Sequence, residues 1–310
     1  MSTIDLDTLF GRRLDFPDMA AAKRLHRLVG LDDVKTRLTK TLGVLVNHHG
    51  PQSWAKKHHP GAEVLLDYLS RRPPLVIFGG DVGTGKTELA EVIGDAVARQ
   101  EDIPITLFPL SLSTRGSGRV GEMTQLLTEA FEVVVQQATR LKGKASGRAG
   151  GAIIMLVDEG DALTQSREAT QMHHEDRAGV NAFIRGVDRL AEQHLPVVVI
   201  LCTNRLSSID PAVQRRAADI FRFIRPNDTQ RRAVLETPLT EAGFSAAEIS
   251  KLVKLTGPSE KSPVGFTFSD LTQRLLPTLV LDAYPDKGIT FERAVELLEA
   301  IQATPQFQEK

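Results

Sequence analysis

The sequence predicts an α/β protein with a central parallel sheet flanked by helices, followed by a smaller helical domain. Up to residue 224, short apolar runs rich in β-branched residues alternate with helix-compatible segments. After Pro226 these runs stop, and the remaining chain is typical of three or four short helices. Because strands that are apolar along their whole length are covered on both faces, the alternation predicts a parallel sheet between two layers of helices.

The sheet is expected to have five strands, one for each apolar run. The runs are residues 74–78, 105–108, 152–157, 196–202 and 220–224. Helical patterns follow Lys86, Glu122, Ala178 and Asp210, and amphipathic spacing predicts a further helix within residues 29–46. Residues 47–61 are rich in turn formers and predict a loop.

These changes along the chain predict three parts. Residues 1–28 form a short N-terminal segment that ends in a basic, helix-compatible stretch. Residues 29–225 form the large α/β domain, and residues 226–310 form the helical domain.

Composition excludes several classes of protein. The 310 residues are 41% hydrophobic and 25% charged, with a formal net charge of −1. Without a positive field, no direct sequence-specific contact with nucleic acid is expected. No apolar run reaches the roughly 18 residues that span a bilayer, and the N-terminus lacks the features of a signal peptide. A single cysteine, Cys202, excludes an internal disulfide. We therefore expect a cytoplasmic protein with no membrane partner.

A glycine-rich loop after the first predicted strand has the pattern G-x-x-x-x-G-K-[ST]. The loop consists of Gly80, Asp81, Val82, Gly83, Thr84, Gly85, Lys86 and Thr87. Between a strand and a helix, this pattern predicts a phosphate-binding loop whose backbone N–H groups and helix dipole surround phosphate. Lys86 is expected to reach the β- and γ-phosphates of ATP, and Thr87 to ligate Mg²⁺. A chance glycine turn is the alternative, and the strand–loop–helix context argues against it.

Two carboxylates follow the third predicted strand. Asp158 suits the Mg²⁺ shell, and Glu159 suits polarisation of the attacking water, because phosphoryl transfer depends mainly on positioning and electrostatics. The alternative is an ordinary capping pair at a strand–helix turn.

Three polar residues further along complete the predicted catalytic set. Asn204 follows the fourth strand, where it could hydrogen-bond the γ-phosphate or the lytic water, although a turn asparagine is also common there. Arg215 and Arg216 end a short predicted helix. They are expected to act on the γ-phosphate of a neighbouring subunit, the alternative being ordinary surface charges.

A second glycine loop contains Arg115, Gly116, Ser117, Gly118 and Arg119. It matches G-x-G-x-x-G, but it does not open the first strand–helix–strand unit. A dinucleotide-binding loop would also be followed by an acidic residue on the next strand roughly 20 residues on, whereas here the next predicted strand begins only at residue 152. We therefore expect that it does not bind a nucleotide phosphate.

Taken together, the motifs resemble those of AAA+ ATPases. The resemblance rests on the phosphate loop, on "DEGDAL" at 158–163, on Thr203-Asn204 and on 210–216, and it runs from about Val29 to the C-terminus. It implies a ring, usually hexameric, with ATP between subunits and residues 226–310 as a lid. Gly30 and Leu31 are similar to the segment that contacts adenine.

Within AAA+, the chain is similar to the pachytene-checkpoint remodellers. The similarity rests on "RGSGRVGEMTQLLTEAF" (115–131), "DEGDALTQSREAT" (158–170), "AGVNAFIRGVDRL" (178–190) and "RRAADIFRFIRP" (215–226). It implies an ATP-driven motor that unfolds part of a HORMA-domain protein. The short N-terminal segment resembles the compact bacterial form, found with HORMA proteins and cyclic-nucleotide synthases in anti-phage signalling. Arg115–Arg119 would then line the central channel and grip polypeptide, the alternative being a solvated connector.

Two departures and two rival functions accompany this resemblance. The channel segment has no aromatic residue, and Ser269 stands where the family has a lid arginine, so Arg274 is a candidate substitute. The rivals are an ATP-dependent nucleic-acid loader and a remodeller of a metabolic enzyme of the Rubisco-activase kind.

Overall fold

The computed structural model describes residues 9–111, 122–143, 149–163, 174–260 and 262–306. Internal contacts divide the chain into two compact units. Unit 1 comprises Met1–His26, Asp33–Gly79 and Thr87–Arg222, and unit 2 comprises Arg27–Asp32, Gly80–Lys86 and Phe223–Lys310. The phosphate-loop residues 80–86 thus group with the C-terminal helices.

A single sheet contains all the strands of the described chain, in the order β1-β3-β4-β5-β2-β6. The strands are β1 (Leu14–Phe16), β2 (Leu75–Gly80), β3 (Ile105–Ser111), β4 (Ala152–Asp158), β5 (Val197–Thr203) and β6 (Asp219–Phe223). Pairs β2–β5, β3–β4 and β4–β5 are parallel, whereas β1 runs antiparallel to β3. The predicted α/β class and all five predicted strands are confirmed.

The prediction of only five strands was wrong, because β1 adds a sixth at one edge. This strand has three residues, of which only Phe16 is buried, so the sequence carries no readable alternation. Its place depends on tertiary contacts. The Phe16 ring lies so close to Gly94 of α6 (Lys86–Glu101) that a side chain at residue 94 would collide with it.

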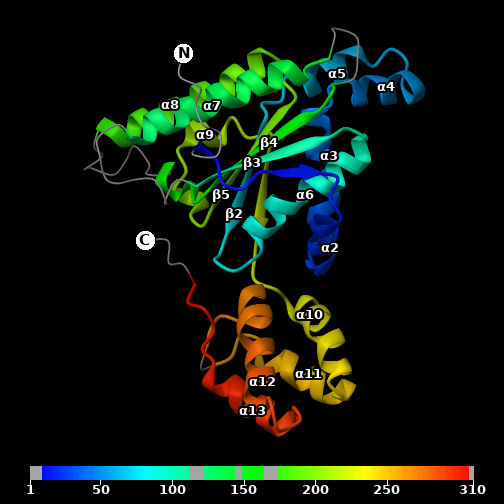
Figure 1. Ribbon diagram of the computed structural model, residues 1–310, viewed down its shortest axis with the longest axis vertical. Coiled ribbons are helices and arrows are strands. Elements are labelled where there is room, and N and C mark those ends of the chain that lie inside the picture. Colours follow the sequence, from blue (N-terminus) through cyan, green and yellow to red (C-terminus); the bar gives the residue numbers. More distant parts are fainter. Residues whose placement is uncertain (1–8, 112–121, 144–148, 164–173, 261, 307–310) are drawn as a thin grey trace. The chain divides into compact units, whose positions relative to one another are not determined.

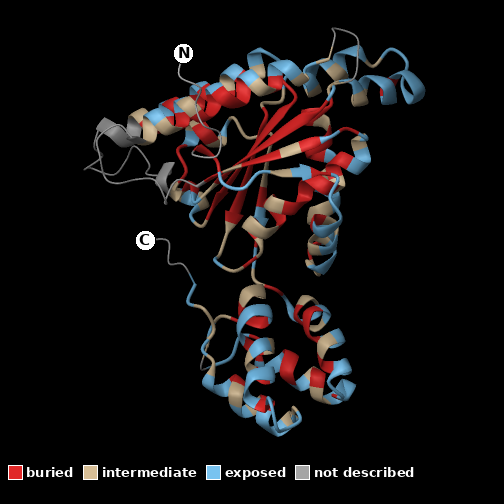
Figure 2. Cartoon of the chain, in the orientation of Figure 1, coloured by how far each residue is buried: buried red, intermediate tan, exposed pale blue. Residues whose placement is uncertain are grey.

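Helices cover both faces of this sheet (Figure 1). The helices of unit 1 are α2 (Met19–Arg27), α3 (Asp32–Val46), α4 (His49–His58), α5 (Glu63–Ser70), α6, α7 (Glu122–Leu141), α8 (His174–Glu192) and α9 (Pro211–Gln214). One end residue each of α2, α3 and α6 groups with unit 2 instead. Alternate strand residues such as Met155 pack with α7 and α8, while Ile154 lies against α6 on the other face. Figure 2 shows the strands buried between these layers. The helix α4 contradicts the predicted loop, because Pro51 falls in its first turn, where proline is tolerated.

Unit 2 is built mainly of helices with their own apolar core. They are α10 (Asp228–Glu241), α11 (Ala246–Leu255), a π-helical segment (Asp270–Leu275), α12 (Leu276–Ala283) and α13 (Phe291–Ala300). Capping boxes begin two of them: Asn227 with Gln230 at α10, and Ser245 with Glu248 at α11. Leu235, Leu252 and Leu271 belong to the core that these helices share. In the described part of the chain no helix is long and apolar enough to cross a membrane.

Candidate active site

The phosphate loop has a backbone that glycine alone fits. Gly80, Gly83 and Gly85 have φ values of 154°, 70° and 91°, in the region that other residues rarely adopt. A side chain at residue 80 would collide with the carbonyl of Phe223, and one at residue 83 would lie 2.7 Å from Thr267 Oγ1. The loop therefore exposes its backbone without side chains in the way, as phosphate binding requires.

Inside this loop, Lys86 is held by carbonyl groups. Its Nζ donates to the carbonyl oxygens of Gly80 at 2.9 Å and Asp81 at 2.7 Å, and the residue is only 6% exposed. Thr84 is fully buried and donates its hydroxyl to the Asp81 carbonyl at 2.7 Å. The ammonium is thereby fixed at the loop.

The two predicted metal ligands lie together. Thr87 Oγ1 donates to Asp158 Oδ1 at 3.3 Å, joining the first turn of α6 to the end of β4. The same Oδ1 accepts the backbone N–H of Glu159 at 2.9 Å. A hydroxyl and a carboxylate are hard oxygen donors of the type Mg²⁺ prefers, so these residues fit the ion.

Glu159 occupies a strained backbone position. Its φ is 54°, and the residue is exposed. A non-glycine residue in the left-handed region costs free energy and persists only where its surroundings impose it, often at functional sites. The backbone thus presents the Glu159 carboxylate to solvent directly after the metal-site aspartate.

Asn204 is held by a carboxylate that sequence reasoning quoted but did not assign. Asp161 accepts the backbone N–H groups of Asn204 and Arg205, each at 3.1 Å, and the Asn204 side-chain amide at 3.3 Å. The Thr203 hydroxyl also donates to Asp161. Asp161 therefore orients the end of β5 from the turn that follows β4. The signal was the third acidic residue in "DEGDAL".

Comparison with known proteins agrees with this arrangement. The family model for the ATPase family associated with various cellular activities (AAA) matches residues 76–225. The chain is 58% identical to CD-NTase-associated protein 6 of Escherichia coli (strain MS 115-1), over 97% of both chains. A second protein of that name, from E. coli strain KTE188, is 38% identical over 96% of this chain and 97% of the relative.

The chain belongs to the CD-NTase-associated protein 6 family of AAA ATPases. Among solved structures it matches a chain of the E. coli MS115-1 HORMA:CdnC:Trip13 complex with a TM-score of 0.89 and 57% identity, covering 98% of this chain and 99% of that one. Rhizobiales Trip13 follows, with a TM-score of 0.74 and 51% identity over 96% and 99% of the chains. The resemblance to the pachytene-checkpoint AAA+ family and the prediction of an ATPase are thereby confirmed, and the protein binds nucleotide.

In this member of the family, the two predicted trans-acting arginines differ in their surroundings. The guanidinium of Arg216 forms a bidentate pair with Asp188, at 2.6 and 2.9 Å, and donates to the Ala212 carbonyl at 3.0 Å. The hydrogen bond that Arg216 donates to Asp188 raises the pKa of the guanidinium. Arg215 is exposed, and it has no polar side-chain partner in the described part of the chain.

Unit 2 contains an arginine that the sequence did not single out. Arg225 Nε donates to Asp81 Oδ2 of the phosphate loop at 2.7 Å, and both side chains are nearly buried. Its other nitrogens donate to the carbonyls of Gly265 at 2.7 Å and Thr304 at 2.8 Å. One guanidinium therefore links the loop, the start of the π-helical region and the C-terminal segment. Sequence gave no signal, because Asp81 and Arg225 are 144 positions apart.

Arg274, the candidate substitute for the lid arginine, is engaged by its own unit. Its Nη1 donates to Asp270 Oδ1 at 2.9 Å and to the Gln302 carbonyl at 3.0 Å. Ser269 N donates to the Gly83 carbonyl at 3.1 Å, so the step that usually carries the arginine touches the phosphate loop through its backbone.

The remaining predicted residues are placed as follows. Gly30, with a φ of 78°, accepts the Gln230 side-chain amide at 2.6 Å, and the buried Leu31 lies beside Gly85. The channel residues Arg115–Arg119 lie outside the described residues. Across the described ranges, no group of three histidine, cysteine or acidic residues forms an additional metal site.

Proposed function

We propose that this chain is an ATP-driven ring motor that remodels HORMA-domain proteins in bacterial anti-phage signalling. The observation that carries the proposal is its 57% identity, over 98% of its length, to a chain of a HORMA:CdnC:Trip13 complex. Its relatives are also called CD-NTase-associated proteins, which supports a cyclic-nucleotide synthase as part of the substrate complex. A cytoplasmic location is part of the same proposal.

The ATPase cycle uses residues of this chain in distinct roles. Lys86 and the loop from Gly80 to Gly85 bind the phosphates, while Gly30 and Leu31 contact adenine. Thr87 and Asp158 hold Mg²⁺, which would neutralise charge on the phosphate oxygens. Glu159 orients the attacking water and accepts its proton. Asn204, held by Asp161, senses the γ-phosphate.

The site is completed by a neighbouring subunit of a homo-hexameric ring. Arg215 is the better candidate for the trans-acting arginine, because Arg216 is committed to Asp188 within its own chain. An arginine supplied in this way stabilises transition-state charge and can be worth about 10³–10⁵ in rate.

Movement of the ring is transmitted to substrate through the channel. Arg115, Gly116, Ser117, Gly118 and Arg119 grip polypeptide there, and the missing aromatic residue implies a weak, less processive hold. Residues 29–225 act as the ATPase domain and residues 226–310 as its lid, behind the segment 1–28.

A capture experiment tests the proposed substrate. Tagged Glu159→Gln protein, which should bind ATP without turnover, is incubated with ATP, Mg²⁺ and host lysate, and bound proteins are identified by mass spectrometry. Lys86→Ala protein, which should not bind ATP, is the matched control. A HORMA-domain protein, alone or with a nucleotide synthase, is expected only with Glu159→Gln. Recovery of nucleic acid, or of a metabolic enzyme alone, would contradict the remodelling proposal and favour one of the rivals.

A further inference from the structure

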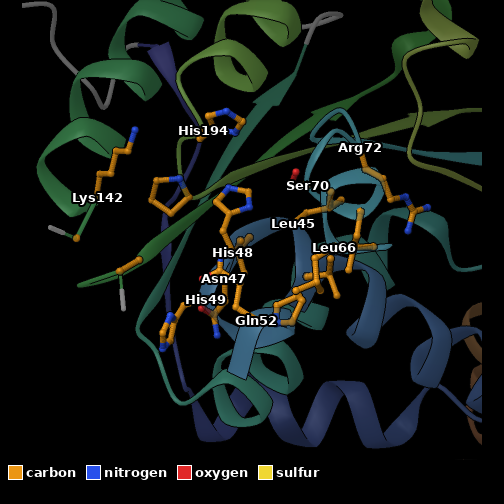
Figure 3. A pocket seen from close by; sticks show the side chains of 17 residues that line it. Leu45, Asn47, His48, His49, Gln52, Leu66, Ser70, Arg72, Lys142 and His194 are labelled. Carbon is orange, nitrogen blue, oxygen red and sulfur yellow. The ribbon is translucent and has the colours of Figure 1, made fainter. Parts of the chain in front are cut away.

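A basic cavity of about 400 Å³ lies in unit 1 beside the amino ends of β4 and β5. The end of α3, the helices α4 and α5, and the chain just before the two strands enclose it (Figure 3). Asp158 and Thr203 are the last residues of these same strands, which have seven residues each. At about 3.3 Å per residue, the cavity is roughly 20 Å from Asp158. It is therefore separate from the candidate active site.

The side chains around this cavity are strongly unbalanced in charge. Five basic residues line it: His48, His49, Arg72, Lys142 and His194. The described lining residues include no carboxylate. Two of these groups already donate to carbonyl oxygens, Arg72 to Ala218 and Lys142 Nζ to Gln193 at 2.5 Å. The Glu101 carboxylate accepts from the lining residue Asn47 at 2.7 Å, so positive charge still exceeds negative charge around the cavity.

His48 shows the effect of this environment. Burial lowers its pKa below the ordinary value, and the nearby His194 and Lys142 lower it further, while a hydrogen bond with the Leu195 backbone offsets part of this shift. Its Nε2 is buried and has no hydrogen-bond partner in the described structure. Once protonated, this nitrogen could donate to an anion, which would satisfy the atom and neutralise the local charge.

His194 occupies a backbone position that normally belongs to glycine. Its φ is 47°, and it ends α8 with the hydrogen bonds typical of a glycine-terminated helix, from His194 N to the Ala191 carbonyl and from Leu195 N to the Leu190 carbonyl. A histidine in this strained position supports a role for its side chain. The ring meets that of His48 edge-on, with centroids 6.1 Å apart (Figure 3).

The opposite wall of the cavity is apolar. Leu45, Leu66 and Leu69 line it from α3 and α5. A few converging polar groups beside an apolar wall are typical of sites for small organic ligands. The ligand should therefore combine an anionic group with an apolar body.

We propose that this cavity binds a small phosphate monoester, whose phosphoryl group contacts the basic cluster and whose organic part packs on the leucines. The site is independent of the substrate proposed above. It would be a second small-molecule binding site on the ATPase, distinct from the nucleotide site.

Calorimetry on the full-length protein tests the site, with the nucleotide site saturated by ADP and Mg²⁺. The probes are phenyl phosphate and inorganic phosphate. Phenyl phosphate should bind roughly tenfold more tightly, because its ring is buried on the apolar wall. Phenyl phosphate should bind more strongly at pH 6.5 than at pH 8.0, because a bound anion favours protonation of His48, whose Nε2 has no hydrogen-bond partner in the described structure, while the monoester remains largely dianionic.

Variants separate binding from folding. His194→Gly removes an imidazole and relieves the backbone, so affinity should fall about tenfold or more while thermal stability stays equal or rises. Lys142→Gln should also weaken binding, whereas Lys57→Gln, on the exposed side of α4, should not. Absence of saturable binding at millimolar phenyl phosphate, or unchanged affinity in His194→Gly and Lys142→Gln, would overturn the proposal. Loss of binding in Lys86→Ala would place the probe in the phosphate loop instead and overturn it equally.

Discussion

The neighbouring arginines Arg215 and Arg216, which directly follow α9, are distinguished by a single carboxylate. Asp188 binds Arg216 through two hydrogen bonds, and Arg215 remains exposed. A side chain held in a bidentate pair must break that pair before it can reach another subunit, whereas an exposed one must only be ordered. Arg215 and Arg216 look equivalent in the sequence, but their surroundings lead us to expect different roles for them.

Arg215→Ala should lower the ATPase rate at least about 10³-fold with little change in thermal stability, because it removes only a trans-acting charge. Arg216→Ala should instead lower the melting temperature, because Asp188 and the end of α9 lose their partner. Steady-state ATPase assays and thermal unfolding of both variants check this. If both variants lost the same ATPase activity and kept the same melting temperature, Arg215 and Arg216 would not have the different roles inferred here.

Asp161 offers a second test at this scale. Asp161→Ala should lower kcat about tenfold or more, with ATP affinity kept, because Asn204 loses the carboxylate that orients it. Asn204→Ala should give a similar loss. If Asp161 acts through Asn204, the double variant should be no worse than either single one. Additive losses would mean that Asp161 acts independently.

The sequence revealed the residues whose chemistry is local and missed those whose role depends on distant partners. Thr87 and Asp158 each come soon after an apolar strand, and parallel strands bring their ends to one edge, so the contact between these two residues could be inferred. Arg225 could not be found in this way. Its position follows "IFRFI" like any surface arginine, and only the folded unit brings it to Asp81.

At the scale of elements, the segment after β6 is anchored through Arg225. This guanidinium and the Asp81 carboxylate are 13% and 11% exposed, so removal of either partner leaves a poorly solvated charge. The loop and the segments that carry Gly265 and Thr304 share that one connection.

Arg225→Gln should therefore destabilise the protein by about 3 kcal/mol and raise KM for ATP, because the poorly solvated Asp81 carboxylate loses its guanidinium beside the phosphate site. Adding Asp81→Asn should restore part of the stability, since it removes the negative charge that the guanidinium compensated. Denaturant unfolding and ATP titrations of the two variants measure the effect. A double variant less stable than Arg225→Gln would contradict this account.

The C-terminal segment is fastened to the π-helical region by Asp270. Burial acts to raise the pKa of this carboxyl, but hydrogen bonds from the Thr267 backbone and from the Thr304 hydroxyl and backbone outweigh it and lower the pKa. A carboxylate with a lowered folded pKa stabilises the fold above its ordinary pKa, and this contribution is lost as pH falls through the folded pKa.

Asp270→Asn should accordingly reduce the free energy of unfolding by about 2 kcal/mol at pH 7, and the difference from the parent should shrink below about pH 4. Unfolding curves across this pH range measure it. Asp286→Asn, which changes an exposed carboxylate of the same unit, is a suitable control. A difference that did not depend on pH would show that packing, not ionisation, makes Asp270 important.

Elements with strong periodicity were predictable, and those fixed by tertiary contacts were not. The long apolar strands and α7 and α8 carry clear patterns over many residues. In contrast, β1 has one buried residue and α4 buries only Ala55, so neither has a face that the sequence alone could reveal.

At the scale of the whole molecule, each active site of the proposed ring is formed by residues from two neighbouring chains. Each site needs a phosphate loop from one copy and Arg215 from another, as expected for a head-to-tail interface that closes into a ring. Two inactive proteins with different defects can then restore activity in each other.

Mixing Lys86→Ala with Arg215→Ala should show this. Random assembly of equal amounts gives an intact loop facing an intact arginine at about a quarter of the interfaces, so the mixture should recover a measurable part of the parent ATPase rate. Neither protein alone should be active, and a mixture of Lys86→Ala with Glu159→Gln is the control that cannot regain a complete site. Failure of the first mixture to exceed this control would argue against a shared site.

The positive φ of Glu159 also has a consequence for how such a protein changes under selection. A left-handed backbone costs a non-glycine residue about 1–2 kcal/mol. Glu159→Gly should therefore raise the free energy of unfolding while abolishing ATP turnover. A laboratory screen for heat resistance alone would thus enrich inactive clones at this codon. Only a screen that also requires ATP hydrolysis would retain the glutamate. The strained glutamate at residue 159 is thus a place where stability and activity make opposite demands on the sequence.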